Sequence, residues 1–171
     1  MELDYMENTK TYSLYVARGL LLLGLGVMSL PQVFAQTAVN PCPFASEYVS
    51  KELGKNFAAG VPEPGLIGKA CVYKDKAAGV QFLIDAGKNQ APSADMWRKM
   101  SNPPGTKWAV VANDPDKAVL IELDASNKYP TLSYERKGIL VTTRIIGADT
   151  ESKAGFDAWS NKLVKMKRVP E

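Results

Sequence analysis

The segment Gly138-Ile-Leu-Val-Thr-Thr-Arg-Ile-Ile146 carries the strongest strand signal in the chain, and a strong helix signal follows it directly. β-Branched residues fill most of this segment, which suits the pleated, half-buried surface of a sheet. After it, Phe156, Trp159, Leu163 and Met166 recur at helical spacing and form one apolar stripe. The apolar face of such a strand and the apolar stripe of the helix can bury each other. The two segments therefore predict a helix packed on a sheet.

This helix is expected to begin just after Asp149-Thr150. Thr150 is the expected N-cap, and Glu151 favours the positive end of the helix dipole. Lys162 is expected on the outer face of the helix, away from the sheet.

Shorter helical and strand patterns precede this pair. Expected helices cover 44–53, 94–100 and 156–166, and expected strands cover 70–74, 80–86, 107–112, 118–124, 132–135 and 138–146. Because successive strands are joined by short turns, they predict an α+β fold with an antiparallel sheet of five to six strands. The N-terminal helix, the short middle helix and the C-terminal helix are all expected to pack on one face of the sheet.

Glycine and proline interrupt the segment from Gly54 to Gly68, which shows no regular element. A structureless loop of this length is uncommon in a compact domain. Two interpretations stay open: a loop with a function of its own, or a loop that contains a short strand around Leu66 and Ile67.

The first 35 residues have the pattern of a signal peptide. Lys10 and Arg18 precede an apolar run at 19–30, which is shorter than the roughly 20 residues of a bilayer-spanning helix. An uncleaved anchor is the alternative. After cleavage no membrane span is expected.

Cleavage is expected between Ala35 and Gln36, whichever of Met1 and Met6 is the true start. Residues 36–171 would then form a single α+β domain in the periplasm or outside the cell. An exported chain with an even number of cysteines favours a disulfide, so Cys42 and Cys71 are expected to be bonded. Two free thiols are the alternative.

The pattern around these cysteines resembles that of a family of small actinobacterial secreted lipoproteins of unknown function. The matching features are Asn40-Pro-Cys42 before a first helix, Cys71-Val-Tyr73 in a first strand, and the amphipathic segment 156–166 at the end. The resemblance implies an α+β fold and a shared cysteine pair.

The composition excludes several function classes. The chain has 21 Lys and Arg, 18 Asp and Glu, and no histidine. The mild positive charge is compatible with contact to an anionic envelope surface, but it is not the concentrated basic face typical of nucleic-acid binding. Without histidine, Ser-His-Asp and Cys-His catalysis and histidine zinc sites are excluded. No phosphate-loop or dinucleotide motif is present either.

Three side chains are candidate site residues. In the expected strand 118–124, Glu122 and Asp124 would share one face, and paired carboxylates can act as acid and base where a pocket separates their pKa values. The alternative is a solvated sheet face, on which these acids lie opposite Thr142 or Arg144.

Two other polar clusters have simpler interpretations. Asn113-Asp-Pro-Asp116 offers oxygen ligands for calcium but lacks the glycine and distal glutamate of a calcium loop, so a turn is expected. The basic end of the last helix (Lys162, Lys165, Lys167 and Arg168) could bind an anionic polymer, but such residues more often offset the helix dipole.

We therefore expect an exported binding domain without enzymatic activity, whose partner is a protein or an envelope ligand, with no metal and no cofactor. One alternative is a polysaccharide-acting hydrolase that uses Glu122 or Asp124, which deep burial and a raised pKa of either acid would favour. Another is an inhibitor that presents the Gly54 to Gly68 loop to a secreted hydrolase, which needs that loop to be rigid and exposed.

Overall fold

The computed structural model describes residues 40–77, 79–147 and 150–169, and the predicted signal peptide lies outside them. The described helices are α1 (Ser46–Leu53), α2 (Ala94–Ser101) and α3 (Lys153–Lys165). The described strands are β1 (Val61–Pro64), β2 (Lys69–Lys74), β3 (Gln81–Lys88), β4 (Trp108–Val110), β5 (Val119–Ile121), β6 (Thr131–Arg136) and β7 (Ile139–Ile146).

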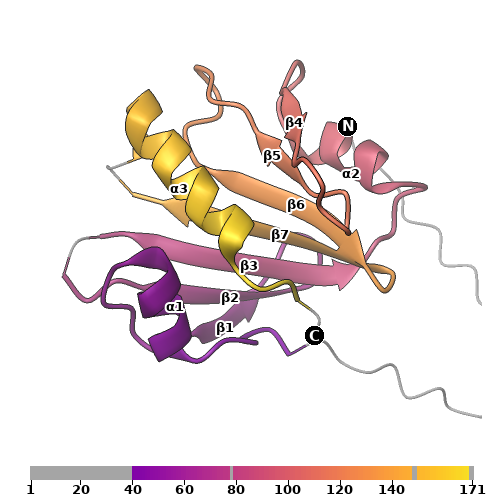
Figure 1. The fold of residues 1–171 in the computed structure, drawn as a ribbon. Coiled ribbons are helices and arrows are strands. Elements are labelled where there is room, and N and C mark those ends of the chain that lie inside the picture. The colour runs from indigo at the N-terminus through magenta and orange to yellow at the C-terminus, as the bar shows by residue number, and fades with distance from the viewer. Residues whose placement is uncertain (1–39, 78, 148–149, 170–171) are drawn as a thin grey trace, which may run out of the picture. The chain divides into compact units, whose positions relative to one another are not determined.

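The strands form one sheet in the order β1-β2-β3-β7-β6-β5-β4, and every neighbouring pair is antiparallel (Figure 1). The predicted α+β class is confirmed. The described residues contain seven strands rather than five to six. β7 lies between β3 and β6 at the centre of the sheet, so the segment with the strongest strand signal pairs along both of its edges.

One face of the sheet is covered by α1 and α3 and holds the hydrophobic core (Figure 1). Phe82 and Ile84 of β3 lie beside Ile145 and Thr143 of β7 in the antiparallel register. Apolar side chains of both helices close over them, with Val49, Leu53, Trp159 and Leu163 all buried. The stripe of α3 is therefore buried against the sheet, as the sequence predicts.

The middle helix is on the opposite face, which corrects the prediction that all three helices share one face. Residues that alternate with the core positions point to this second face, which we call the α2 face: Val72, Leu83, Val119, Thr142 and Arg144. Trp97 of α2 lines a hollow together with four of these, namely Val72, Leu83, Thr142 and Arg144. No residue of α2 belongs to the hydrophobic core cluster.

β1 is a strand that the sequence does not predict. It pairs with β2 from Val61↔Val72 to Pro64↔Lys69, while Leu66 and Ile67 lie in the turn that follows it. All four residues of β1 are exposed, because β1 is an edge strand. The segment from Gly54 to Gly68 is thus partly regular, and the strand lies before the position considered for it.

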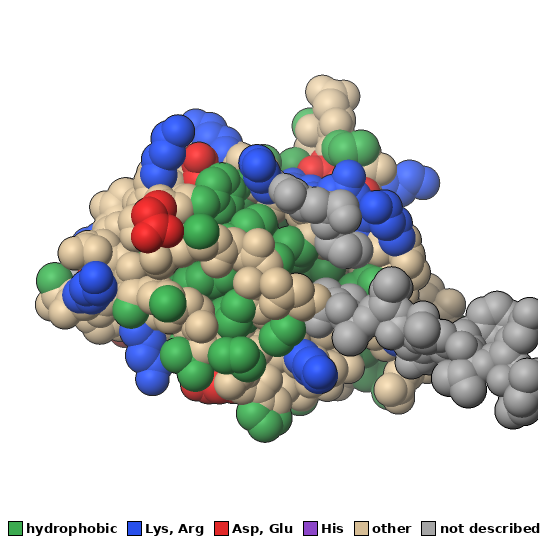
Figure 2. All heavy atoms as spheres, turned by 90° about the horizontal axis from the view of Figure 1, so that it is seen from below, with side chains coloured by type: hydrophobic (Ala, Val, Ile, Leu, Met, Phe, Trp, Pro, Cys, Tyr) green, Lys and Arg blue, Asp and Glu red, His purple; other side chains and the backbone are tan. Residues whose placement is uncertain are grey.

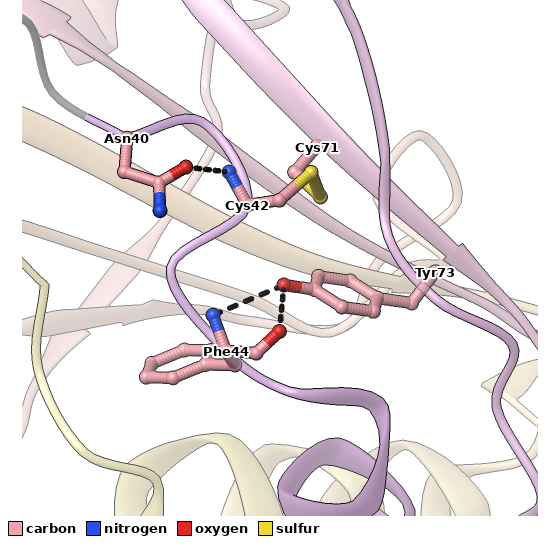
Figure 3. The surroundings of a disulfide bond; sticks show 5 residues. All are labelled: Asn40, Cys42, Phe44, Cys71 and Tyr73. Carbon is pink, nitrogen blue, oxygen red and sulfur yellow. Dashed lines mark hydrogen bonds between the residues drawn. A yellow bond between two sulfur atoms is a disulfide. The ribbon is translucent and has the colours of Figure 1, made fainter.

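The segment before α1 is fastened to β2 by a disulfide and by a tyrosine. Cys42 and Cys71 are bonded, as predicted (Figure 3). The Tyr73 hydroxyl donates to the Phe44 carbonyl at 2.9 Å and accepts from the Phe44 amide at 3.2 Å. A Cβ at Gly60 would collide with Cys71 Sγ and the Tyr73 ring, so glycine is required where β1 approaches this cluster.

The N-cap of α3 is Ser152, whose hydroxyl accepts from the Gly155 amide at 3.1 Å. The predicted N-cap, Thr150, is instead fully buried, and its hydroxyl donates to the Gly147 carbonyl at 2.8 Å. The prediction for Lys162 is also wrong. Its Nζ donates to the Leu53 carbonyl at 2.6 Å and lies 4.3 Å from the Trp159 ring centroid, so Lys162 joins α3 to the end of α1.

Candidate functional site

The α2 face is the face that α1 and α3 leave uncovered. Its helix contributes one buried residue, Arg98, which forms an ion pair with Asp95 on the same helix. The Arg98 guanidinium also lies over the Trp108 ring, with 5.8 Å between its central carbon and the ring centroid. Because α2 contacts this face through polar and aromatic side chains rather than an apolar stripe, it leaves hollows on both sides.

The hollow on the β1 side of α2, which we call the Arg144 pocket, has a volume of about 210 Å³. It lies between α2, the turn after β1 and the central strands. The residues that line it are Glu63, Pro64, Gly65, Leu66, Ala70, Val72, Leu83, Asp85, Trp97, Thr142 and Arg144. The pocket thus combines apolar walls with one arginine and two carboxylates.

Arg144 is half-buried in this pocket, and its side chain has one hydrogen bond to the described residues. Its Nε donates to Thr131 Oγ1 at 3.1 Å. No carboxylate in residues 40–77, 79–147 or 150–169 lies within ion-pair distance of it. Burial lowers the pKa of the Arg144 guanidinium, and the charges of Asp85 and Tyr129 act in the opposite direction. Arginine remains protonated in proteins, so this is a half-buried positive charge.

Asp85 is near Arg144, but its carboxylate already accepts hydrogen bonds from the backbone. Its carboxylate accepts from the amides of Leu66 at 2.6 Å, Ile67 at 3.1 Å and Gly68 at 3.4 Å. A Cβ at Gly65 would collide with the Asp85 carboxylate, so this close approach needs glycine. Asp85 therefore holds the turn that forms one rim of the pocket.

Two buried hydroxyl groups lie next to Arg144 along the sheet. Thr142 and Ser133 are directly opposite each other on β7 and β6. Thr142 Oγ1 and Ser133 Oγ are both buried and have no hydrogen-bond partner among the described residues. A buried hydroxyl without a partner costs free energy, so groups of this kind usually have a bonding role. Thr142 also lines the Arg144 pocket.

Two wider hollows lie on the other side of α2. One is lined by residues of α2, the loop after it and β4, including Arg98, Lys99 and Trp108, and has a volume of about 580 Å³. The other, of about 480 Å³, extends over β5 and β6 beside Val119 and Glu135. Together with the Arg144 pocket, they give the α2 face three hollows in the described part of the chain.

The predicted carboxylate pair is not assembled into a site. β5 ends at Ile121, and Glu122 is exposed beside a shallow hollow between β5 and α3. Asp124 lies in the turn that follows, where it accepts from the Asn127 side chain at 2.8 Å and from the Ser126 amide at 2.7 Å. These hydrogen bonds lower the pKa of Asp124. Of the three predicted site residues, Arg144 lines a pocket while half-buried, Glu122 lines an open hollow while exposed, and Asp124 lies in a turn.

The two simpler interpretations fit the contacts. Asp114 accepts from the amides of Asp116 and Ala118, which closes a turn between β4 and β5. Its other oxygen accepts from Arg168 at 2.6 Å in a buried ion pair, so Arg168 is not available to an anionic polymer. The described residues contain no group of three acidic or cysteine side chains that could hold a metal ion.

Trp97, Asp85 and Thr142 are members of the pocket that the sequence does not single out. One signal exists for Thr142, because Thr142 and Arg144 are alternate polar residues in an apolar strand, which indicates a polar second face. No periodic pattern marks Trp97, because α2 has only eight residues. The local sequence around Asp85 indicates a solvent-facing strand residue. The amides that donate to its carboxylate are 17 to 19 positions away in the chain, so no local pattern shows them.

Among the helices that the structure describes, none is long and apolar enough to cross a membrane. Comparisons of the chain with protein-family models, with curated proteins and with solved structures gave no match.

Proposed function

We propose that residues 36–171 are an exported binding domain without enzymatic activity, and that the ligand binds on the α2 face. The observation that carries this proposal is the contrast between the two faces of one sheet. The face under α1 and α3 holds the core cluster of apolar side chains and has an open hollow, between β5 and α3, whereas the α2 face has three hollows next to half-buried Trp97, Trp108 and Arg144. Concave surfaces with aromatic walls and few polar groups are typical of ligand sites.

Export is supported by the sequence of the first 35 residues and by the disulfide. Cys42 and Cys71 are bonded in the structure, and such bonds persist mainly in oxidising compartments. A periplasmic or secreted location is therefore part of the proposal.

The hydrolase alternative gains no support from its two named acids. Glu122 is exposed, and the pKa of Asp124 is lowered rather than raised by its hydrogen bonds. A general acid needs a raised pKa, which is the reverse of what the Asp124 turn produces.

The binding proposal is tested by mapping where small molecules contact the folded protein. A library of small carboxylates, amines, neutral aromatics and short peptides would be titrated into ¹⁵N-labelled residues 36–171. We expect amide shifts to concentrate at Trp97, Leu83, Thr142 and Arg144. Shifts confined to α1 and α3, or no shifts with any compound, would contradict the proposal.

A second candidate function is inhibition of a secreted hydrolase by the segment 61–68. An inhibitory segment of this kind needs to be rigid and exposed. This segment is rigid, because β1 is paired with β2 and the turn after it is hydrogen-bonded to Asp85. It is also exposed, with Val61 54% and Leu66 76% accessible. Figure 2, which shows the molecule from the side on which α1 and β1 lie in Figure 1, shows hydrophobic side chains gathered with lysines and arginines around them.

The inhibitor candidate predicts that Leu66 inserts into the cleft of a hydrolase. A panel of secreted peptidases and muramidases would be assayed with the wild-type domain and with Leu66→Asp. We expect the wild type to inhibit at least one enzyme and Leu66→Asp to lose that inhibition. Met100→Asp, at a similarly exposed apolar residue on α2, is the control and should inhibit as well as the wild type.

A further inference from the structure

We propose that the Arg144 pocket binds a small carboxylate with an apolar body, with the carboxylate on Arg144 and the body against Trp97, Val72 and Leu83. This inference rests on the proposed binding function and names the ligand class for one of the hollows on the α2 face.

The first argument is the unused bonding capacity of Arg144. A guanidinium has five N–H donors, and one of them is used, by Thr131. A charge taken out of water without a partner is unfavourable, and Asp85, a carboxylate of the pocket whose charge acts on Arg144, already accepts from three backbone amides. The two terminal nitrogens therefore offer a parallel pair of donors for an incoming anion.

Thr142 does not hold the anion. This residue is 9% exposed and lines the same pocket as Arg144, but its hydroxyl oxygen is buried away from solvent. A ligand that enters from solvent therefore pairs with Arg144 and not with this hydroxyl.

Charge favours a carboxylate over a phosphate. Asp85 and Glu63 line the pocket together with Arg144, so the pocket has one positive and two negative side chains. The two carboxylates repel a dianion about twice as strongly as a monoanion, while either can form a bidentate pair with the guanidinium. The pocket therefore favours a carboxylate over a doubly charged phosphate or sulfate.

The volume of the pocket and the side chains that line it determine the size and the polarity of the part of the ligand that carries the carboxylate. A volume of about 210 Å³ is below the roughly 300 to 1,000 Å³ of sites for drug-sized molecules. Apolar side chains from Val72, Leu83 and Trp97 also line the pocket, and Leu83 is the cross-strand neighbour of Arg144. The ligand is thus either a small free acid or the terminal residue of a peptide, both of which present one carboxylate on an apolar body.

The test uses probes that differ in one feature each. Phenylacetate has the carboxylate and the body, phenylacetamide keeps the shape without the charge, acetate lacks the body, and phenyl phosphate has the body with a second charge. A dipeptide ending in phenylalanine and its C-terminal amide distinguish a peptide terminus from a free acid. Binding to residues 36–171 would be measured by titration calorimetry and by amide shifts.

We expect phenylacetate to bind more than tenfold more tightly than phenylacetamide, acetate and phenyl phosphate. Arg144→Gln should weaken phenylacetate binding by at least tenfold. Arg136→Gln is the control, because Arg136 is an arginine on β6 that does not line the pocket and whose side chain pairs with Asp116 at 3.7 Å. It should leave the affinity unchanged.

Equal binding of phenylacetamide, tighter binding of phenyl phosphate, or a folded Arg144→Gln that binds phenylacetate like the wild type would overturn the inference. If no carboxylate binds while another compound shifts the amide resonances of Trp97 and Leu83, the inference fails and the binding proposal stands. Circular dichroism of each variant checks that it is folded. If Arg144→Gln is unfolded, the comparison of phenylacetate with phenylacetamide and phenyl phosphate on the wild-type protein still decides the question.

Discussion

Asp114 and Arg168 form the most buried ion pair described in this chain, with side-chain exposures of 6% and 10%. Their Oδ2–Nη2 distance is 2.6 Å, and the Arg168 guanidinium also lies 5.1 Å from the Tyr134 ring centroid. Removing one partner leaves the other charge buried without compensation, which typically costs about 3–5 kcal/mol. We therefore expect Asp114→Ala to lower the free energy of unfolding by about that amount in urea melts.

The matched control is the exposed pair of Lys153 and Asp157, whose side chains are 77% and 51% exposed. Asp157→Ala should lower the free energy of unfolding by less than about 1 kcal/mol. A cost for Asp114→Ala as small as this would show that Arg168 finds another partner or reaches solvent.

The pH dependence of this pair follows from the pKa of Asp114. Burial alone would raise that pKa, but the hydrogen bond and the charge of Arg168, with two backbone amides, outweigh burial and lower it. The folded state thus holds the proton less tightly than the unfolded state, so the pair's contribution is present above the ordinary pKa of an aspartate and is lost as pH falls through the lowered one. The cost of Asp114→Ala should accordingly shrink in melts below about pH 4.

Tyr134 gives a prediction for alkaline pH. Burial raises its pKa to about 12, and its hydroxyl accepts from the Val169 amide at 2.9 Å. Because the folded state holds this proton more tightly, the stabilisation is complete below the unfolded pKa of about 10 and is lost as pH rises through 12. Tyrosinate absorbance at 295 nm should show a late step near pH 12.

Tyr134→Phe should remove that late step. Tyr129→Phe is the comparison, because Tyr129 is 40% exposed and its loss should leave the step near pH 12 in place. If the late step survives in Tyr134→Phe, another buried tyrosine produces it.

At the scale of elements, α3 depends on its contact with the sheet. A helix of 13 residues is marginal in water by itself, so burial of its stripe against β6 and β7 supplies most of its stability. Trp159 is 5% exposed in the middle of that stripe. Trp159→Ala should destabilise the domain by about 3–5 kcal/mol, measured as a shift of the urea midpoint.

Lys165→Ala on the exposed side of α3 is the control for Trp159→Ala. It should change the free energy of unfolding by less than about 0.5 kcal/mol. Lys162→Ala is unsuitable, because Lys162 caps the end of α1 through the Leu53 carbonyl. A Trp159→Ala variant as stable as the wild type would show that the side chain is not needed in the core.

Elements with a regular pattern could be predicted from the sequence, and those without one could not. The stripe of α3 and the β-branched run of β7 were enough to place both at the core. β1 has no such pattern, because Pro62 and Pro64 argue against a strand and are tolerated only at a sheet edge. β5 ends three residues before the predicted end, because the Asp124 side chain bonds the backbone into a turn.

The position of α2 could not be predicted for a related reason. Leu83 and Leu140 make the second face of β3 and β7 partly apolar, so the sequence does not show which face a short helix will cover. Once α2 is on the second face, Trp97 and Arg144 meet from segments 47 positions apart. A cavity formed in this way is not visible in any local pattern, although Arg144 itself is marked by the polar alternation of its strand.

At the scale of the whole molecule, the disulfide joins the segment before α1 to the second strand of the sheet. The bond closes a loop between residues 29 positions apart, for which chain entropy gives about 3 to 4 kcal/mol of stabilisation. The bond also lies among other contacts, because Phe44 and Tyr73 are hydrogen-bonded beside it. Replacing both Cys42 and Cys71 by alanine should therefore lower the free energy of unfolding without abolishing the fold.

Reduction of the wild type distinguishes stabilisation by the disulfide from the loss of side-chain packing that the two alanine substitutions cause. A reducing agent should lower the urea midpoint of the wild type toward that of the Cys42→Ala/Cys71→Ala variant and leave the variant itself unchanged. Thiol labelling of the denatured, unreduced wild type should find no reactive cysteine if the exported protein carries the bond. If reduction leaves the midpoint unchanged, the contacts of Phe44 and Tyr73 are sufficient to hold α1 on the sheet. The bond would then act on the rate of unfolding rather than on the unfolding equilibrium.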